Sequence, residues 1–130
     1  MKIPKLKNKA FIIDLHIYPV KVFVVIGNPK QIKPLLLNYK NPPTEKDLEI
    51  LDSDLIFDGY YGFSYQLKYN SNFLIWIAKD APIFDIIPHE VLHCVQDIFR
   101  HIGENNLSED NTEAFCYLNG YINQKIFEQI

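Results

Sequence analysis

Residues 85–101 read DIIPHEVLHCVQDIFRH, and their apolar side chains recur with the period of an α-helix. Pro88 falls in the first turn, where its missing N–H has no intrahelical partner, and Gly103 stands where helices commonly end. We predict one helix from near Asp85 to His101. At about 100° per residue, its apolar arc collects Val91, Leu92, Val95, Ile98, Phe99 and Ile102.

Two β-hairpins are predicted before this helix. Apolar and polar residues alternate over 13–18, and the β-branched run Val20–Ile26 follows, closed by a Gly-Asn-Pro turn. Tyr60–Tyr69 and Phe73–Ala78 are rich in aromatic and β-branched residues, and the turn-forming tripeptide at 70–72 separates them. These two pairs of segments indicate an opening hairpin and a second hairpin.

The remaining segments complete a prediction of an α+β fold. Prolines at 34, 42 and 43 exclude a long regular element, although Leu35–Leu37 must be buried, and Thr44 is typical of the N-cap of a short helix ending near Leu51. A last helix begins near Ser108 or Asp110, and its Gly120 allows close approach to another element. Its apolar face contains Phe115, Leu118, Ile122 and Ile126. We expect a twisted, mainly antiparallel sheet packed against both long helices.

Residues 89–93, HEVLH, spell the pattern HExxH within the predicted helix. His89 and His93 are four apart, so both imidazoles lie on one helical face and can bind one ion. Zinc accepts neutral imidazole readily, and the adjacent Glu90 can take a proton from a zinc-bound water. The alternative is that these residues form the ordinary polar face of an amphipathic helix.

The combined pattern from Asp85 to Ile122 resembles the gluzincin branch of the zincin HExxH metallopeptidases and is similar to small phage-encoded metallopeptidases. The resemblance implies a minimal zincin-like domain with one zinc ion per chain. In gluzincins a glutamate on the next helix completes the site, and here Glu113, separated from His93 by nineteen residues, corresponds to it. The expected ligands are therefore His89, His93 and Glu113, with Glu90 as the catalytic residue.

Other assignments for the third ligand stay open. Glu104, Glu109 and Asp110 are substitutes, and Glu113 also fits a capping box that begins at Asp110. Thermolysin-like enzymes place an aspartate four residues after the third ligand, where this chain has Tyr117. Support for a zinc-bound histidine must then come from elsewhere.

Composition and charge restrict the partners. The 130 residues suit a single domain, 1–130, and the net charge of −3 gives no reason to expect nucleic acid. No apolar run approaches the ~20 residues of a membrane span. Cys94 and Cys116 are expected to be buried free thiols, which favours a cytoplasmic location. The phage resemblance makes that the bacterial host cytoplasm, leaves virion association open, and suggests a viral or host protein partner.

The predicted function is zinc-dependent hydrolysis of peptide bonds by an endopeptidase-type enzyme. In zincins the strand before the motif helix often forms the edge of the active site and binds the substrate main chain, a role for Phe73–Ala78 here. One alternative is a catalytically silent zinc-binding protein with a structural or interaction role, such as a phage component or an inhibitor. Another is a metal-free interaction module in which HExxH is accidental.

Overall fold

The sheet is mixed and has four strands in the order β1-β2-β4-β3. The computed structural model describes residues 6–16, 18–39, 43–51, 60–67, 72–104 and 107–130. The strands are β1 Lys9–Asp14, β2 Lys21–Ile26, β3 Gly62–Gln66 and β4 Asn72–Ile77. Both predicted hairpins occur as antiparallel pairs, whereas the central pair, β2 and β4, is parallel. The prediction of the first strand over 13–18 is wrong, because the strand ends at Asp14 and the chain then turns, with the Tyr18 N–H donating to the Leu15 carbonyl at 2.9 Å. The chain crosses between these two strands through helical segments, a connection that parallel pairing requires.

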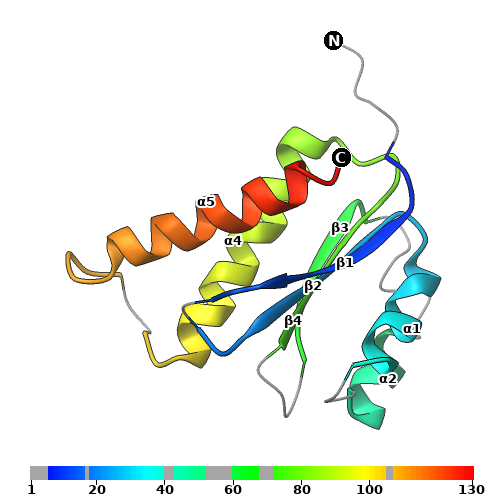
Figure 1. Cartoon of the computed structure of the whole chain (residues 1–130), viewed down its shortest axis with the longest axis horizontal. Coiled ribbons are helices and arrows are strands. Elements are labelled where there is room, and N and C mark those ends of the chain that lie inside the picture. The colour runs from blue at the N-terminus through cyan, green and yellow to red at the C-terminus, as the bar shows by residue number, and fades with distance from the viewer. Residues whose placement is uncertain (1–5, 17, 40–42, 52–59, 68–71, 105–106) are drawn as a thin grey trace.

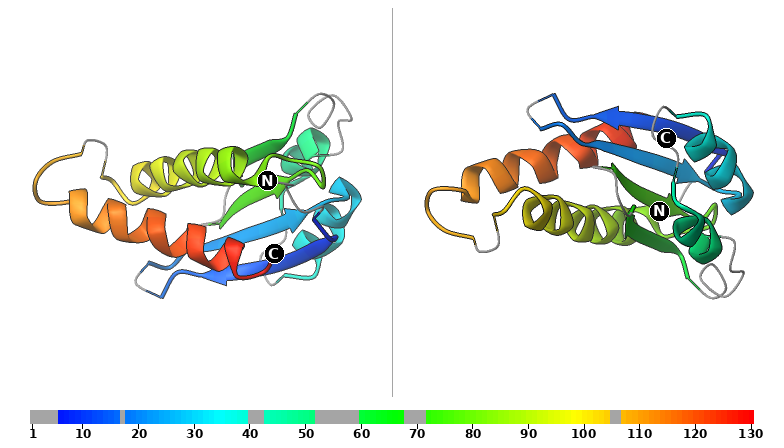
Figure 2. Two further views of the ribbon diagram at one scale, coloured as in Figure 1. Left: turned by 90° about the horizontal axis from the view of Figure 1, so that it is seen from above. Right: turned by 90° about the horizontal axis from the view of Figure 1, so that it is seen from below.

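Helices cover both faces of this sheet. The helical elements are η1 Pro29–Gln31, α1 Ile32–Leu37, α2 Glu45–Leu51, α4 Ile83–His101 and α5 Thr112–Phe127. Figures 1 and 2 show α4 and α5 on one face and α1 and α2 on the other. Ring contacts support this arrangement. On one face the Phe73 ring contacts His101 of α4, with centroids 5.9 Å apart, and on the other the Phe23 ring contacts Tyr39, just after α1, with centroids 5.1 Å apart. The sequence prediction did not include the second helical layer.

Helix α2 is capped and fastened to strand β3 by one buried carboxylate. The predicted N-cap is confirmed, because Thr44 Oγ1 accepts from the Asp47 N–H and the Asp47 carboxylate accepts from the Thr44 N–H, each at 3.1 Å. Asp47 is fully buried, and the Tyr65 hydroxyl donates to it at 2.8 Å. Burial and this carboxylate raise the pKa of the Tyr65 phenol, so the phenol remains a donor.

Strand β4 is an interior strand, which corrects one prediction. All six of its residues are buried, as in strands covered on both faces, and β2 and β3 occupy its two sides. Phe73–Ala78 therefore cannot serve as the open edge assigned to it from the sequence. Among the described strands, the edge nearest the motif helix is β3.

Helix α4 confirms the predicted motif helix and begins two residues before Asp85. Gly103 has a φ of 93° and closes the helix as expected. Its N–H donates to the Arg100 carbonyl at 3.2 Å, and the Glu104 N–H donates to the Phe99 carbonyl at 2.8 Å, which is a Schellman motif. Leu92, predicted to be in the apolar arc, is 43% exposed. Across the described residues no helix, α4 included, is long and apolar enough to span a membrane.

Helix α5 lies antiparallel beside α4 (Figure 2). Phe84 near the start of α4 stacks on Phe127, and Phe99 near its end contacts Phe115, with centroids 6.0 and 5.2 Å apart. Nothing lies within 4 Å of a Cβ placed on Gly120, so the predicted close approach at this glycine is wrong. The helix core instead consists of Leu118, Ile122 and Ile126, which are buried as expected.

The two cysteines occupy different environments. Cys94 is fully buried on α4, whereas Cys116 is exposed on α5, so the prediction of two buried thiols holds for Cys94 alone. Burial raises the pKa of the Cys94 thiol and keeps it protonated. A protonated, inaccessible thiol is neither a nucleophile nor a ready metal ligand.

Candidate metal centre

The two motif histidines meet on the exposed side of α4. Their four-residue spacing brings the Nε2 atoms of His89 and His93 to 3.2 Å, with ring centroids 4.7 Å apart and ring planes at 76°. Two nitrogens bound tetrahedrally to zinc at their usual bond lengths lie about 3.3 Å apart. The pair therefore has the spacing of two zinc ligands. The same distance also suits a hydrogen bond between a protonated and a bare ring nitrogen.

Glu90 distinguishes this face from an ordinary polar helix surface. It is only 7% exposed, although the side chain of the preceding His89 is 61% exposed. Its Oε1 lies 3.7 Å from His89 Nε2. Burial raises the pKa of the Glu90 carboxyl, and the charges of the two histidines partly oppose that rise. A buried carboxyl beside two imidazoles is suited to proton transfer and to stabilisation by a nearby cation.

Strand β3 supplies the wall against which Glu90 lies. A Cβ placed on Gly62 would stand 2.9 Å from Glu90 Cγ and 2.6 Å from Ile86 Cγ2, so the two elements are in close contact there. Farther along, Gln66 Nε2 lies 3.3 Å from His101 Nδ1. Residues 62, 64 and 66 therefore face α4, and β3 runs beside the helix from the motif to its C-terminal end.

The outer side of β3 carries backbone groups that β4 does not use. The Ala78 N–H donates to the Tyr61 carbonyl at 2.8 Å, and the Leu67 N–H donates to the Asn72 carbonyl at 3.1 Å. Hydrogen-bonded positions alternate along an antiparallel pair, so residues 61, 63, 65 and 67 bond to β4. The N–H and C=O groups of 62, 64 and 66 point away from β4, and none of the described strands pairs with that side. Within the described part of the chain, an unpaired strand edge therefore lies next to the motif.

The structure does not bring Glu113 to the histidine pair. Among the described residues, no group of three His, Cys, Asp or Glu side chains is placed to hold a metal ion. Phe115, next but one to Glu113, packs on Phe99, which is six residues beyond His93 and so about 9 Å farther along α4. Phe99 also lies about half a turn around the helix from Glu90. Glu113 as the third ligand therefore stays a prediction.

The capping-box alternative for Glu113 is wrong. The N-cap of α5 is Asn111 rather than Asp110, which leaves Glu113 at the second helical position instead of the third. The Asn111 side chain accepts from the Ser108 N–H at 2.8 Å and donates to Glu104 at 3.0 Å. Glu113 is thus exposed near the start of a helix, where a negative charge is favourable.

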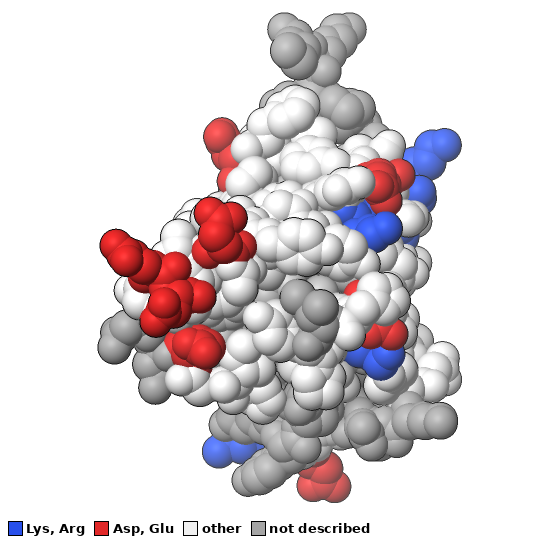
Figure 3. Space-filling model, turned by 60° about the vertical axis from the view of Figure 1, so that its left-hand side comes forward, with Lys and Arg blue, Asp and Glu red and all other residues white. Residues whose placement is uncertain are grey.

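The substitute ligands also lie near the start of α5. Glu104, Glu109 and Asp110 lie between the end of α4 and the start of α5. The motif, at residues 89–93, lies in the first half of α4. With this side turned forward, Figure 3 shows acidic side chains gathered on one flank. The described residues place no histidine pair among them. This flank gives no support for a metal site of its own.

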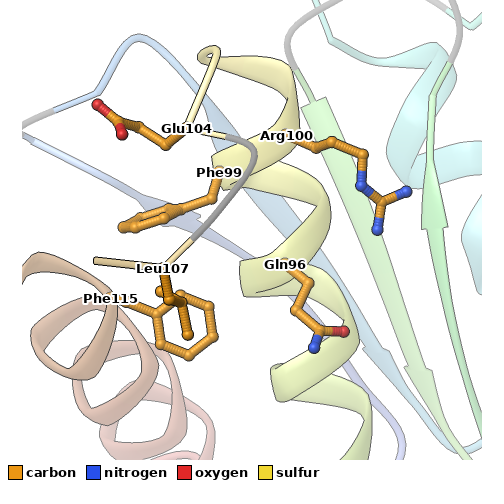
Figure 4. Close-up of a pocket in the computed structure, with 6 residues that line it drawn as sticks. All are labelled: Gln96, Phe99, Arg100, Glu104, Leu107 and Phe115. Carbon is orange, nitrogen blue, oxygen red and sulfur yellow. The ribbon is translucent and has the colours of Figure 1, made fainter. Parts of the chain in front are cut away.

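A cavity of about 240 Å³ lies between the end of α4 and the start of α5. Phe99, Leu107 and Phe115 come together there, while Gln96 and Arg100 extend away from them (Figure 4). The cavity begins one turn beyond His93 and contains neither motif histidine. The candidate site is therefore the exposed His89–His93 face and the β3 edge rather than this cavity.

Comparison of the chain with protein-family models, with curated proteins and with solved structures finds no match.

Sequence reasoning missed Gly62 and the β3 edge. A glycine within the aromatic segment Tyr60–Tyr69 was the available signal, because glycine in a strand often marks a close approach of another element.

Proposed function

We propose that this chain is a zinc-dependent peptidase of the zincin type, with His89 and His93 as metal ligands and Glu90 as the proton-transferring residue. The observation that carries the proposal is the Nε2 pair at 3.2 Å with a buried carboxyl beside it. An accidental polar helix face has no reason to bury its glutamate. A cation bound by the pair would offset the cost of that burial.

The reaction assigns one role to each part of the site. Zinc, when bound, lowers the pKa of a coordinated water and polarises the substrate carbonyl. The Glu90 carboxylate would accept a proton from the attacking water and return it to the leaving amine. The outward N–H and C=O groups of residues 62, 64 and 66 align an extended peptide as an added strand. The substrate class is therefore an extended segment of a peptide or protein.

The third ligand is part of the proposal. Glu113 is the residue that the resemblance to gluzincins implies, although the structure keeps it apart from His89 and His93. Zinc affinity measured by competition with a chromophoric chelator tests it directly. Glu113→Gln is expected to weaken zinc binding more than Glu109→Gln does. Equal affinity in these two variants would remove Glu113 from the ligand set.

Metal analysis tests the zinc site. Protein purified without chelator is expected to contain one zinc per chain, and His89→Ala is expected to lose it. Metal-free wild-type protein would contradict the proposal.

A second candidate is a zinc-binding structural or interaction protein without hydrolysis. Tyr117 favours it, because it stands where thermolysin-like enzymes place the aspartate that supports a zinc-bound histidine. A peptide-library cleavage assay that compares wild-type protein with Glu90→Gln separates the two candidates. Cleavage by wild type alone supports the peptidase, and zinc without cleavage in either protein supports the silent zinc protein.

A further inference from the structure

Gly62 lies where β3 is in close contact with α4. A Cβ at this position would meet Ile86 Cγ2 at 2.6 Å, Glu90 Cγ at 2.9 Å and the Trp76 carbonyl oxygen at 3.3 Å. Distances under 3.0 Å essentially never occur for a real Cβ, so any larger residue would displace Ile86 and Glu90. The absent side chain is what lets the Glu90 side chain lie against the strand.

Backbone conformation does not explain this glycine. The described glycines with positive φ are Gly27 and Gly103, whereas Gly62 is in β3 and has no such angle. An extended strand position accepts most residues and favours β-branched ones, and glycine there weakens the strand. The packing of α4 against β3 is the remaining structural reason for glycine at position 62.

The contact determines where the Glu90 carboxyl lies. Glu90 Cγ is held against the strand and its Oε1 lies 3.7 Å from His89 Nε2. A methyl group at position 62 would turn the Glu90 side chain outward, away from the strand and into solvent. His89 and His93 are on the exposed side of α4 and would keep their mutual geometry.

We propose that Gly62 is a positioning residue for Glu90: its missing side chain holds the Glu90 carboxyl against β3 and beside the histidine pair. The catalytic consequence rests on the proposed peptidase function, whereas the steric basis does not. Gly62→Ala should therefore impair proton transfer without removing the metal.

Four variants separate positioning from general damage. Gly62→Ala is compared with the double variant Gly62→Ala/Ile86→Ala, which removes the clash with Ile86 Cγ2 and keeps the clash with Glu90. Ile86→Ala alone is the background for the double variant. Gly120→Ala is the matched control, because the same added methyl meets nothing within 4 Å there. The double variant covers the case in which Gly62→Ala alone does not fold.

The expected result is a split between chemistry and binding. Displacing a catalytic group by about 1 Å can cost about 100-fold in rate, so kcat should fall by that order in both Gly62 variants. KM and zinc stoichiometry should remain those of the background. Unchanged kcat in the folded double variant, or zinc lost in parallel with kcat, would overturn the proposal.

A second measurement does not depend on activity. The zinc-free proteins are treated with a water-soluble carbodiimide and an amine, and labelling of Glu90 is compared by mass spectrometry with that of the exposed Glu113. The labelling ratio of Glu90 to Glu113 should rise severalfold in both Gly62 variants and stay unchanged in Gly120→Ala. A constant ratio would overturn the proposal. If wild-type protein cleaves no peptide, the peptidase function fails while the ratio still decides the role of Gly62.

Discussion

Helix α4 packs against α5 and against β3 in different ways. Against α5 it places aromatic rings at both ends, Phe84 on Phe127 and Phe99 on Phe115. Against β3 it places a carboxyl on a glycine, Glu90 on Gly62. The first arrangement stabilises the fold through buried apolar area, and the second places a titratable group next to two histidines. We call the side of α4 that packs on β3 the β3 flank and the side that packs on α5 the α5 flank. Substitutions on these two flanks should therefore affect different properties.

The largest expected effect is on the β3 flank. Glu90→Gln should reduce peptide hydrolysis by about 10²- to 10⁴-fold, the usual contribution of a general base, while zinc content stays at one per chain. Hydrolysis rate and metal content measured on the same preparation test this. Hydrolysis that survives in Glu90→Gln would show that this flank has no catalytic role.

The largest effect on the α5 flank should be loss of stability. Phe99 is 3% exposed and contacts both Phe115 and Tyr18, so Phe99→Ala should cost about 3–5 kcal/mol of unfolding free energy. Urea unfolding measures the loss, and Leu92→Ala, at a 43% exposed position of the same helix, is the control. If the folded Phe99 variant lost zinc selectively, the two flanks would not be functionally separate.

A smaller effect is expected where β3 is fastened to α2. Tyr65→Phe leaves the buried Asp47 carboxylate without its 2.8 Å donor, which should cost about 1–3 kcal/mol. Denaturation of this variant is compared with that of Tyr117→Phe, at a 62% exposed position. Equal stability of the two variants would mean that the Asp47 hydrogen bond does not support the edge strand.

The buried carboxyl also predicts a pH dependence in zinc-free protein. Because burial raises the pKa of Glu90 in the folded state, the folded protein holds this proton more tightly than the unfolded chain does. Folding stability from this group is therefore complete at low pH and decreases as pH rises through the ordinary glutamate pKa toward the raised one. Thermal unfolding of zinc-free Glu90→Gln should lack this decrease, so its advantage over wild type should appear at neutral pH and vanish in acid.

The smallest expected effect is a gain on the outer surface of α5. Gly120→Ala adds a methyl group that meets nothing within 4 Å and removes a helix-interior glycine, which should stabilise the protein by about 0.5–1 kcal/mol. Thermal unfolding checks the sign. A loss of stability instead would indicate a close approach at Gly120.

Local patterns predicted the elements well because each depends on near neighbours. The helical period and Gly103 marked α4, Thr44 marked the start of α2, and the β-branched run Val20–Ile26 marked β2. Alternation over 13–18 placed the first strand too late in the chain, because β1 is Lys9–Asp14. The parallel pairing of β2 with β4 was missed because it joins strands that are far apart in sequence. The interior position of Phe73–Ala78 was missed for the same reason, since a strand's neighbours are not written in its own residues.

The amino-acid sequence by itself determined the His89–Glu90–His93 constellation, because residues four apart on a helix share a face wherever the helix lies. Only the tertiary structure decided that Glu90 packs against β3 and that β3 rather than β4 forms the edge of the sheet. It also decided that, among the described residues, Glu113 does not form a metal-binding group with the histidines. Those outcomes depend on contacts between segments distant in the chain, which are set by how the helices and the sheet pack together.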